Sequence, residues 1–299
     1  MAQLRRNHSS QNKGLQTSFK LVVFFIFAVI ALTAGLAYFK KQLTGLSENT
    51  TEATFDYSLR TFLPSSRGEI VHHKHYSLSY AEQHEQAEWV AYTMNRDMLS
   101  KPNVARFEFF NLDTAVKTKS ATHRDYNNSG YTRGHLVPAG DMAFDTAAMR
   151  ETFFMSNISP QKKAFNNGIW KELEENVRDW TYKNEMLYII SGPIFQNASQ
   201  KIGKEIKITV PTDFYKVLLD YNSSEKNGIA FIIPNELSEK RLEDYMVTID
   251  EVEKITGLDF FDSMIENNVE ENIESKINKK LWKVSDKRYQ LRINIWNHE

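Results

Sequence analysis

Short apolar runs bounded by turn residues recur along the chain after residue 67. Runs rich in β-branched and aromatic residues are typical of strands, whereas apolar positions three and four residues apart are typical of helices. The runs that predict strands are 69–72, 76–80, 89–94, 186–190, 206–210, 214–221 and 228–233. With two helical segments between and after them, they predict one α+β domain, residues 68–299, in which helices flank a central, mainly antiparallel sheet.

Two segments carry helical spacing. The first covers 169–182, where apolar side chains follow one another at intervals of three or four residues: Ile169, Leu173, Val177 and Trp180. The second begins at Thr248, has Glu251 three residues later and meets Gly257 at its end. Threonine and glutamate in this order form a capping box, and a glycine commonly ends a helix.

The N-terminal region has a different pattern. Residues 21–39 form a run of nineteen uncharged, mostly apolar residues. At about 1.5 Å per residue this run spans the hydrocarbon core of a bilayer. Residues 1–20 before it are basic, and residues 40–67 after it are rich in Ser, Thr and Glu. These features predict a cytoplasmic N-terminus, a single transmembrane helix and a tether.

A cleavable signal peptide is the alternative for 21–39, because small residues gather near its end. We favour an uncleaved anchor, since the apolar run is longer than a usual signal sequence and Lys40 and Lys41 follow it directly. The anchor predicts a membrane-bound protein whose domain lies outside the cytoplasm, in the periplasm or at the cell surface. Cleavage would make the protein secreted.

Composition limits the chemistry that the domain can perform. The chain has no cysteine, so any metal must bind to oxygen or imidazole. The formal net charge is −1, but residues 236–274 contain 13 acidic residues against only Lys240, Arg241 and Lys254. This acidic segment would have to face away from a polyanionic partner.

Candidate chemistry concentrates between residues 131 and 180. Hydrolysis of a phosphodiester needs a base for water and positive charge for the phosphate. His135 suits the first need, because a histidine is largely neutral at physiological pH. Arg133 would lie on the same face of an extended segment and could meet the phosphate. Gly134 between them leaves room for that approach.

The segment from Asn166 to Arg178 could complete a one-metal phosphodiesterase site. Asn166 lies near the start of the predicted helix, where its amide oxygen could cap the helix or bind a hydrated Mg²⁺ ion. In a regular helix Glu174 would lie about 12 Å farther along the axis, so it would act through water. Arg178 could form an ion pair with Glu174, four residues before it.

These motifs resemble those of a known nuclease family. The segments Tyr131 to Ala139, Ser156 to Gln161 and Asn166 to Glu174 are similar to the signatures of the DNA/RNA non-specific endonucleases, a ββα-metal (His-Me finger) group. Weaker similarity extends over residues 68–261. The resemblance implies a ββα-metal nuclease fold and a metal-dependent endonuclease that hydrolyses phosphodiester bonds in its substrates, DNA and RNA.

The resemblance also implies roles for individual residues. His135 would be the general base, Asn166 the single protein ligand of Mg²⁺, with Mn²⁺ as a possible substitute, and Glu174 a group that holds the waters of the metal. Arg133 would contact the phosphate or stabilise the transition state. Arg106 is similar to an upstream catalytic arginine of the family.

Asn157 is implied to support the site by hydrogen bonding, and Arg178 is a further candidate for a supporting role. Where the family commonly has Asp before Arg-Gly-His, this chain has Thr132. This departure predicts an altered rate or metal affinity. Together with the lack of a strongly basic total charge, it motivates the alternative of a catalytically silent nucleic-acid-binding or interaction domain that retains the nuclease fold. A phosphodiesterase that acts on another secreted substrate is a third possibility.

Overall fold

The structure is a computed structural model that describes residues 62–265 and 267–298. These residues belong to one compact unit, Phe55–Glu299. The predicted N-terminus, anchor and most of the tether lie outside the described residues, so these assignments stay predictions. No helix in the described part of the chain is both long and apolar enough to span a membrane.

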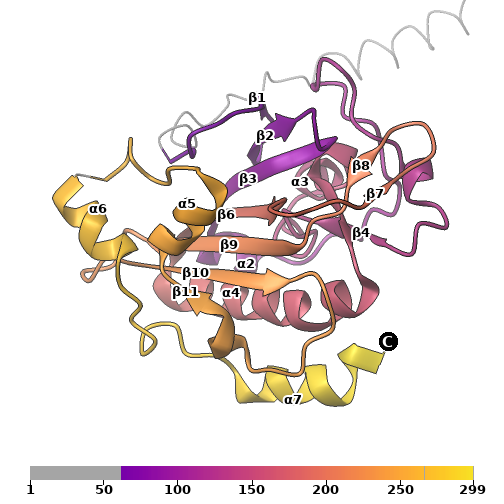
Figure 1. Cartoon of the computed structure of the whole chain (residues 1–299). Helices are drawn as coiled ribbons and strands as arrows, with labels where there is room; N and C mark the ends of the chain where they lie inside the picture. The colour runs from indigo at the N-terminus through magenta and orange to yellow at the C-terminus, as the bar shows by residue number, and fades with distance from the viewer. Residues whose placement is uncertain (1–61, 266, 299) are drawn as a thin grey trace, which may run out of the picture. The chain divides into compact units, whose positions relative to one another are not determined.

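A seven-stranded sheet is the centre of the fold (Figure 1). Its order is β1-β2-β3-β6-β9-β10-β11, and every neighbouring pair is antiparallel. This confirms the predicted mixed α+β fold with its antiparallel sheet. The strands are β1 Glu69–His72, β2 Ser77–Ala81, β3 Gln86–Asn95, β6 Met186–Ile194, β9 Asp213–Asp220, β10 Asn227–Pro234 and β11 Met246–Val247.

Helices occur on both faces of this sheet. The α-helices are α2 Arg96–Ser100, α3 Thr146–Glu151, α4 Lys171–Asn184, α5 Ile249–Thr256, α6 Asn267–Glu274 and α7 Asp286–Asn294. Short 3₁₀ turns are η2 His123–Tyr126, η3 Met155–Asn157, η5 Leu242–Tyr245 and η6 Trp296–His298. The second predicted helix is confirmed as α5, with Thr248 as its cap, the capping box to Glu251, and Gly257 at a φ of 69°.

Strand β3 shows how the two faces are filled. Its residues alternate between two hydrophobic clusters, with Tyr92 in one and Trp89 in the other, and both side chains are fully buried. The first cluster contains Leu173 of α4, and the second contains Val252 of α5. Figure 1 shows α4 and α5 on opposite sides of β9 and β10. The helices therefore bury both faces of the sheet, which is why its central strands are apolar on both sides.

Two small sheets lie beside the main one. Strand β4, Thr132–His135, pairs with β5, Ile158–Gln161, and strand β7, Lys201–Ile202, pairs with β8, Ile208–Thr209. The strand predicted over 206–210 is thus only two residues long. Its other backbone groups bond elsewhere: Val210, for example, donates its amide hydrogen to the carbonyl of Gln200 at 2.9 Å.

The segment before α4 is not the regular helix that the spacing predicts. Residues Phe165–Trp170 form a π-helical turn, η4, and Gly168 within it has non-helical angles of φ −95° and ψ −109°. The expected 12 Å rise from Asn166 to Glu174 therefore does not apply, because it assumed regular helix between them. A π turn inside a helix often occurs at a functional site.

The C-terminal segment packs along α4. Arg292 of α7 is fully buried and forms an ion pair with Glu172, while it also donates to the carbonyls of Ser238 and Lys240. Trp282 packs edge-on against Trp180 of α4, with ring centroids 5.4 Å apart. Residues beyond the region of family resemblance therefore hold the helix that carries Glu174.

Candidate active site

One cavity of about 380 Å³ brings together six of the seven predicted site residues. It lies between the β4–β5 pair, the π turn and α4. The predicted residues that line it are Arg106, Arg133, His135, Asn166, Glu174 and Arg178. The other lining residues are Phe110, Pro138, Ala139, Gly140, Asn167, Lys171 and Glu175. Side chains far apart in the sequence are thus collected around a single hollow.

His135 is the last residue of β4 and is 91% buried, with 9% of its surface exposed. Its Nε2 atom has no hydrogen-bond partner among the described residues. The ring packs against Phe153 and Phe110, with centroids 4.8 and 5.7 Å away. Burial, together with the positive charge of Arg106, lowers the pKa of His135 to about 3. The imidazole is therefore neutral at physiological pH, and a lone pair is available to accept a proton.

The β4 strand places Arg133 and His135 on one face, as the alternation predicts. Arg133 donates to the carbonyl of His123 at 3.0 Å and to Oδ1 of Asn127 at 2.7 Å. Its guanidinium also lies 5.4 Å from the ring centroid of Phe110. These contacts hold an arginine at the wall of the cavity, with the planar fork that suits a phosphate.

Gly134 is needed for a reason other than the predicted one. A Cβ atom there would lie 2.0 Å from the Cδ and Oε1 atoms of Gln161, which is fully buried. The crowding comes from the side chain of the paired strand, on the face opposite to Arg133 and His135. The glycine therefore allows β4 and β5 to approach, rather than leaving room for a substrate.

Asn166 is oriented by Thr132. The Nδ2 group of Asn166 donates to Oγ1 of Thr132 at 3.1 Å, and the same hydroxyl donates to the carbonyl of Gln161 at 2.9 Å. Because the hydroxyl donates elsewhere, it can only accept from Asn166. This assigns the amide nitrogen to Thr132 and leaves Oδ1, which receives no hydrogen bond from the described residues, for the cavity. A neutral oxygen of this kind suits a hard, hydrated divalent ion.

Glu174 shares its environment with a buried lysine that the sequence analysis missed. Burial raises the pKa of Glu174 to about 7, although the charge of Arg178 opposes this rise. Lys216 of β9 is fully buried, and its Nζ has no hydrogen-bond partner but lies 4.9 Å from the ring centroid of Trp170. Burial lowers the pKa of Lys216 to about 8, while Glu174 acts in the opposite direction. The positive charge of Lys216 and the negative charge of Glu174 therefore stabilise each other.

The predicted ion pair between Arg178 and Glu174 is wrong. Arg178 instead pairs with Oδ1 of Asp141 at 2.5 Å and with Oε1 of Glu175 at 2.9 Å. Asp141 is buried and also accepts a hydrogen bond from the hydroxyl of Tyr92 at 2.7 Å. Asp141 comes from a distant loop, so helical spacing alone could not reveal that it would capture the arginine.

Asn157 does not line the cavity. It is fully buried, and its amide accepts from the backbone nitrogen of Val137 at 2.9 Å and donates to the carbonyls of Val137 and Thr152 at 3.0 and 2.8 Å. These bonds fix the backbone two residues after His135. The placement agrees with the supporting position that the resemblance implies.

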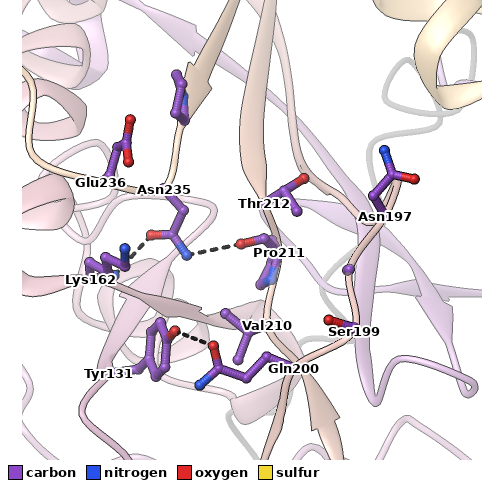
Figure 2. A pocket seen from close by; sticks show the side chains of 12 residues that line it. Tyr131, Lys162, Asn197, Ser199, Gln200, Val210, Pro211, Thr212, Asn235 and Glu236 are labelled. Atoms are coloured by element: carbon purple, nitrogen blue, oxygen red, sulfur yellow. Dashed lines mark hydrogen bonds between the residues drawn. The ribbon is translucent and has the colours of Figure 1, made fainter.

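A second hollow, of about 330 Å³, lies beyond the first residue pair of β4 and β5 (Figure 2). Tyr131 and Lys162 line it, and the hydroxyl of Tyr131 donates to Gln200 at 2.9 Å. Asn235 links its walls by accepting from the amide of Lys162 and donating to the carbonyl of Pro211. It shares no lining residue with the first cavity, and none of the predicted site residues lies in it.

Comparisons with known proteins show the family of this chain. The DNA/RNA non-specific endonuclease family matches residues 58–267. The mitochondrial nuclease EXOG of Danio rerio is 30% identical over 265 residues, which cover 83% of this chain and 76% of that protein. A nuclease of Nostoc sp. is 31% identical over 264 residues, covering 80% and 92%.

A solved structure has a similar fold. A chain of the EndoG/EndoGI complex superposes with a TM-score of 0.64 at 26% identity, covering 69% of this chain and 91% of that one. The family match spans β4, β5, the π turn and α4, which together surround the cavity. The chain therefore belongs to the DNA/RNA non-specific endonuclease family.

Proposed function

We propose that this endonuclease hydrolyses phosphodiester bonds in DNA and RNA with His135 as general base and one divalent ion, Mg²⁺ or as a substitute Mn²⁺, bound at Asn166. The observation that carries the proposal is that one cavity brings together a neutral histidine and an amide oxygen without a hydrogen bond. The histidine is His135, whose Nε2 has no hydrogen-bond partner among the described residues, and the oxygen is Oδ1 of Asn166, left available because the amide nitrogen bonds to Thr132.

His135 removes a proton from the attacking water. Its depressed pKa keeps the ring neutral before substrate binds. A bound phosphate brings negative charge next to the ring, which raises the affinity of the imidazole for a proton at the moment when one is transferred. The aromatic rings of Phe153 and Phe110 hold the imidazole in place.

Arg133 and Arg106 bind the phosphate. Both guanidinium groups line the cavity with His135, so their charges offset the negative charge that grows on phosphorus oxygens in the transition state. Contacts of this kind read no base, and DNA and RNA share the same phosphate. This accounts for an enzyme without sequence preference.

Asn166 would hold the ion through its Oδ1 atom, and Glu174 would orient water molecules around it. When bound, a divalent ion supplies Lewis-acid stabilisation of the phosphate and the leaving oxygen. Glu174 can perform its part only when ionised, because the carboxylate accepts hydrogen bonds from water. The buried Lys216 favours that charged form.

Plasmid nicking by the full-length protein in Mg²⁺ tests the proposal. We expect His135→Ala to lower the rate by about 10²- to 10⁴-fold, the usual contribution of a general base. His84→Ala is the matched control, since His84 lies outside the cavity and stacks on Phe195. Equal cleavage by His135→Ala and the wild type would remove His135 from the mechanism.

A silent nucleic-acid-binding domain is the alternative, motivated by Thr132. It predicts binding of DNA without cleavage under any divalent metal. The hydrogen bond between Thr132 and Asn166 argues against it, because this bond prepares the amide oxygen as a ligand instead of removing it.

We also propose that residues 21–39 anchor the enzyme in a membrane, with the catalytic domain on the extracytoplasmic side. The proposal rests on the uncharged run and its basic N-terminal flank. N-terminal sequencing of the mature protein tests it. A first residue near position 40 would show that the segment is removed and the enzyme released.

A further inference from the structure

Three carboxylates from two helices converge on the side of the sheet away from the catalytic cavity. Asp250 and Glu253 belong to α5, and Glu274 is the last residue of α6. One oxygen from each lies within 4.8 Å of the others. Both helices contribute residues to the second hydrophobic cluster, which contains Trp89 and no residue of α4. Figure 1 shows the two helices together on one side of the sheet. This carboxylate cluster is therefore separate from the Asn166 cavity.

Glu274 is the unusual member of the carboxylate cluster. It is only 6% exposed, and its Oε1 atom has no hydrogen-bond partner in the described part of the chain. No basic side chain among residues 62–265 and 267–298 forms an ion pair with any of the three carboxylates. An ionised carboxyl group that is buried without a partner is strongly unfavourable.

The negative charges around Glu274 further disfavour its ionised form. Burial and the negative charges of Glu253, Glu270, Asp250 and Asp259 together raise the pKa of Glu274 to about 9. Glu274 also ends α6, where the helix dipole is negative and disfavours a further negative charge. A cation at the carboxylate cluster would offset these negative charges.

The donor set has the chemistry of a calcium site. Calcium takes about six to eight oxygen ligands and binds several protein carboxylates directly. Magnesium keeps several of its waters and is usually bound through only one or two carboxylates. Three carboxylates, each able to offer an oxygen to the same point, therefore suit calcium better. Glu253 is already fixed, because its Oε1 accepts from the amide of Phe260 at 2.8 Å and leaves Oε2 available.

We propose that Asp250, Glu253 and Glu274 form a calcium site that joins α5 to α6. The ion links the end of α6 to a helix that is packed on the sheet. Its effect is on stability, since the carboxylate cluster and the catalytic cavity share no residue. The long acidic segment 236–274 thus has a role besides keeping negative charge away from the substrate.

Calcium binding by full-length protein, purified in detergent and stripped with EDTA, tests the site. Isothermal titration with CaCl₂ over about 0.01–1 mM, the range of weaker carboxylate sites, gives the number of ions bound. Glu274→Gln keeps the shape of the side chain, and Asp250→Asn changes an exposed residue that can be replaced without loss of the fold. Glu271→Gln, an exposed neighbour on α6, is the matched control.

We expect the wild type and Glu271→Gln to bind one more calcium ion than Glu274→Gln, or to bind it at least about tenfold more tightly. Calcium should raise the melting temperature of the first two proteins but have a smaller effect on Glu274→Gln and Asp250→Asn. Equal stoichiometry, affinity and thermal shift in all four proteins would overturn the site. Plasmid cleavage in Mg²⁺ should be the same for Glu274→Gln and the control.

Discussion

At the scale of single residues, the departure from the family pattern at Thr132 has a structural explanation. The hydroxyl donates to the carbonyl of Gln161 and accepts from the amide of Asn166, so a neutral side chain determines which end of that amide faces the cavity. A carboxylate at this position could accept from the same amide but could not donate to Gln161. Threonine thus connects the proposed metal ligand to the β4–β5 pair through one atom.

Replacement of Thr132 should therefore impair metal use. We expect Thr132→Val, which keeps the shape, to lower kcat/KM about five- to tenfold, the effect of one lost hydrogen bond of about 1–1.4 kcal/mol. The Mg²⁺ concentration for half-maximal cleavage should rise as well. Thr132→Ser retains the hydroxyl and is the control. An unchanged metal requirement in Thr132→Val would show that Thr132 does not position Asn166.

Lys216 gives a prediction of pH dependence. Its positive charge lowers the pKa of Glu174 against the upward effect of burial. Lys216→Met removes that charge, so the pKa of Glu174 should rise above about 7 and the carboxyl should be protonated at neutral pH. Activity should fall at pH 7 and recover toward pH 9, which a pH-rate profile would detect.

Lys183→Met, at an exposed position on α4, is the control for that experiment. Its profile should match that of the wild type. The unfolding midpoint of Lys216→Met should not fall, because methionine has a similar volume, the lost ammonium group is buried without a hydrogen-bond partner, and Glu174 can take up a proton once that charge is removed. A profile of Lys216→Met identical to the wild type would separate Lys216 from the function of Glu174.

Local motifs were enough to select His135, Arg133 and Asn166, which the fold brings to one cavity, because each motif depends on immediate neighbours in the sequence. Asp141 and Lys216 were missed since long-range folding brings them to the site. Lys216 did leave a signal: it is the only charged residue within the apolar run 214–219, where a strand buried on both faces would not otherwise carry an ammonium group. That signal marks a buried charge, but it does not identify Glu174 as its neighbour.

At the scale of elements, the π turn and α4 depend on α7. Periodicity predicted α4 and α5 well, because their apolar stripes are local and each packs on the sheet. It could not predict the non-helical Gly168, whose position is crowded by Asn297: a Cβ on Gly168 would lie 2.5 Å from the Oδ1 of that residue. The conformation of the turn and the packing of the C-terminal segment are therefore coupled.

The buried ion pair between Arg292 of α7 and Glu172 of α4 can be used to measure the coupling between these two helices. We expect Arg292→Met to lower the free energy of unfolding by about 3–5 kcal/mol, because Glu172 would remain buried without its partner. Arg292→Met combined with Glu172→Leu should recover much of this loss. Urea denaturation of the two single variants and the double variant gives the coupling energy. Independent, additive effects would contradict a direct link.

At the scale of the whole molecule, fold class and sheet were predictable because alternating apolar runs specify strands wherever they pair. The order of the strands in the sheet could not be predicted, since it depends on contacts between strands distant in sequence, such as β3 with β6.

The charged residues are distributed unequally between the two faces of the sheet. The acidic helices α5 and α6 lie on one side of the sheet, and the arginines of the cavity lie on the side of α4. The net charge of −1 thus conceals the acidic character of α5 and α6.

The packing of η6 near the cavity also bears on how the enzyme can be handled. Lys171 lines the cavity, and its Nζ lies 4.4 Å from the ring centroid of Trp296, close to the end of the chain. A polyhistidine tag fused after residue 299 would be separated by only two residues from Asn297, whose side chain lies against Gly168 in the π turn that also carries the proposed metal ligand, Asn166. Its imidazoles would compete for the ion, and a purified enzyme could then look inactive because of the tag alone.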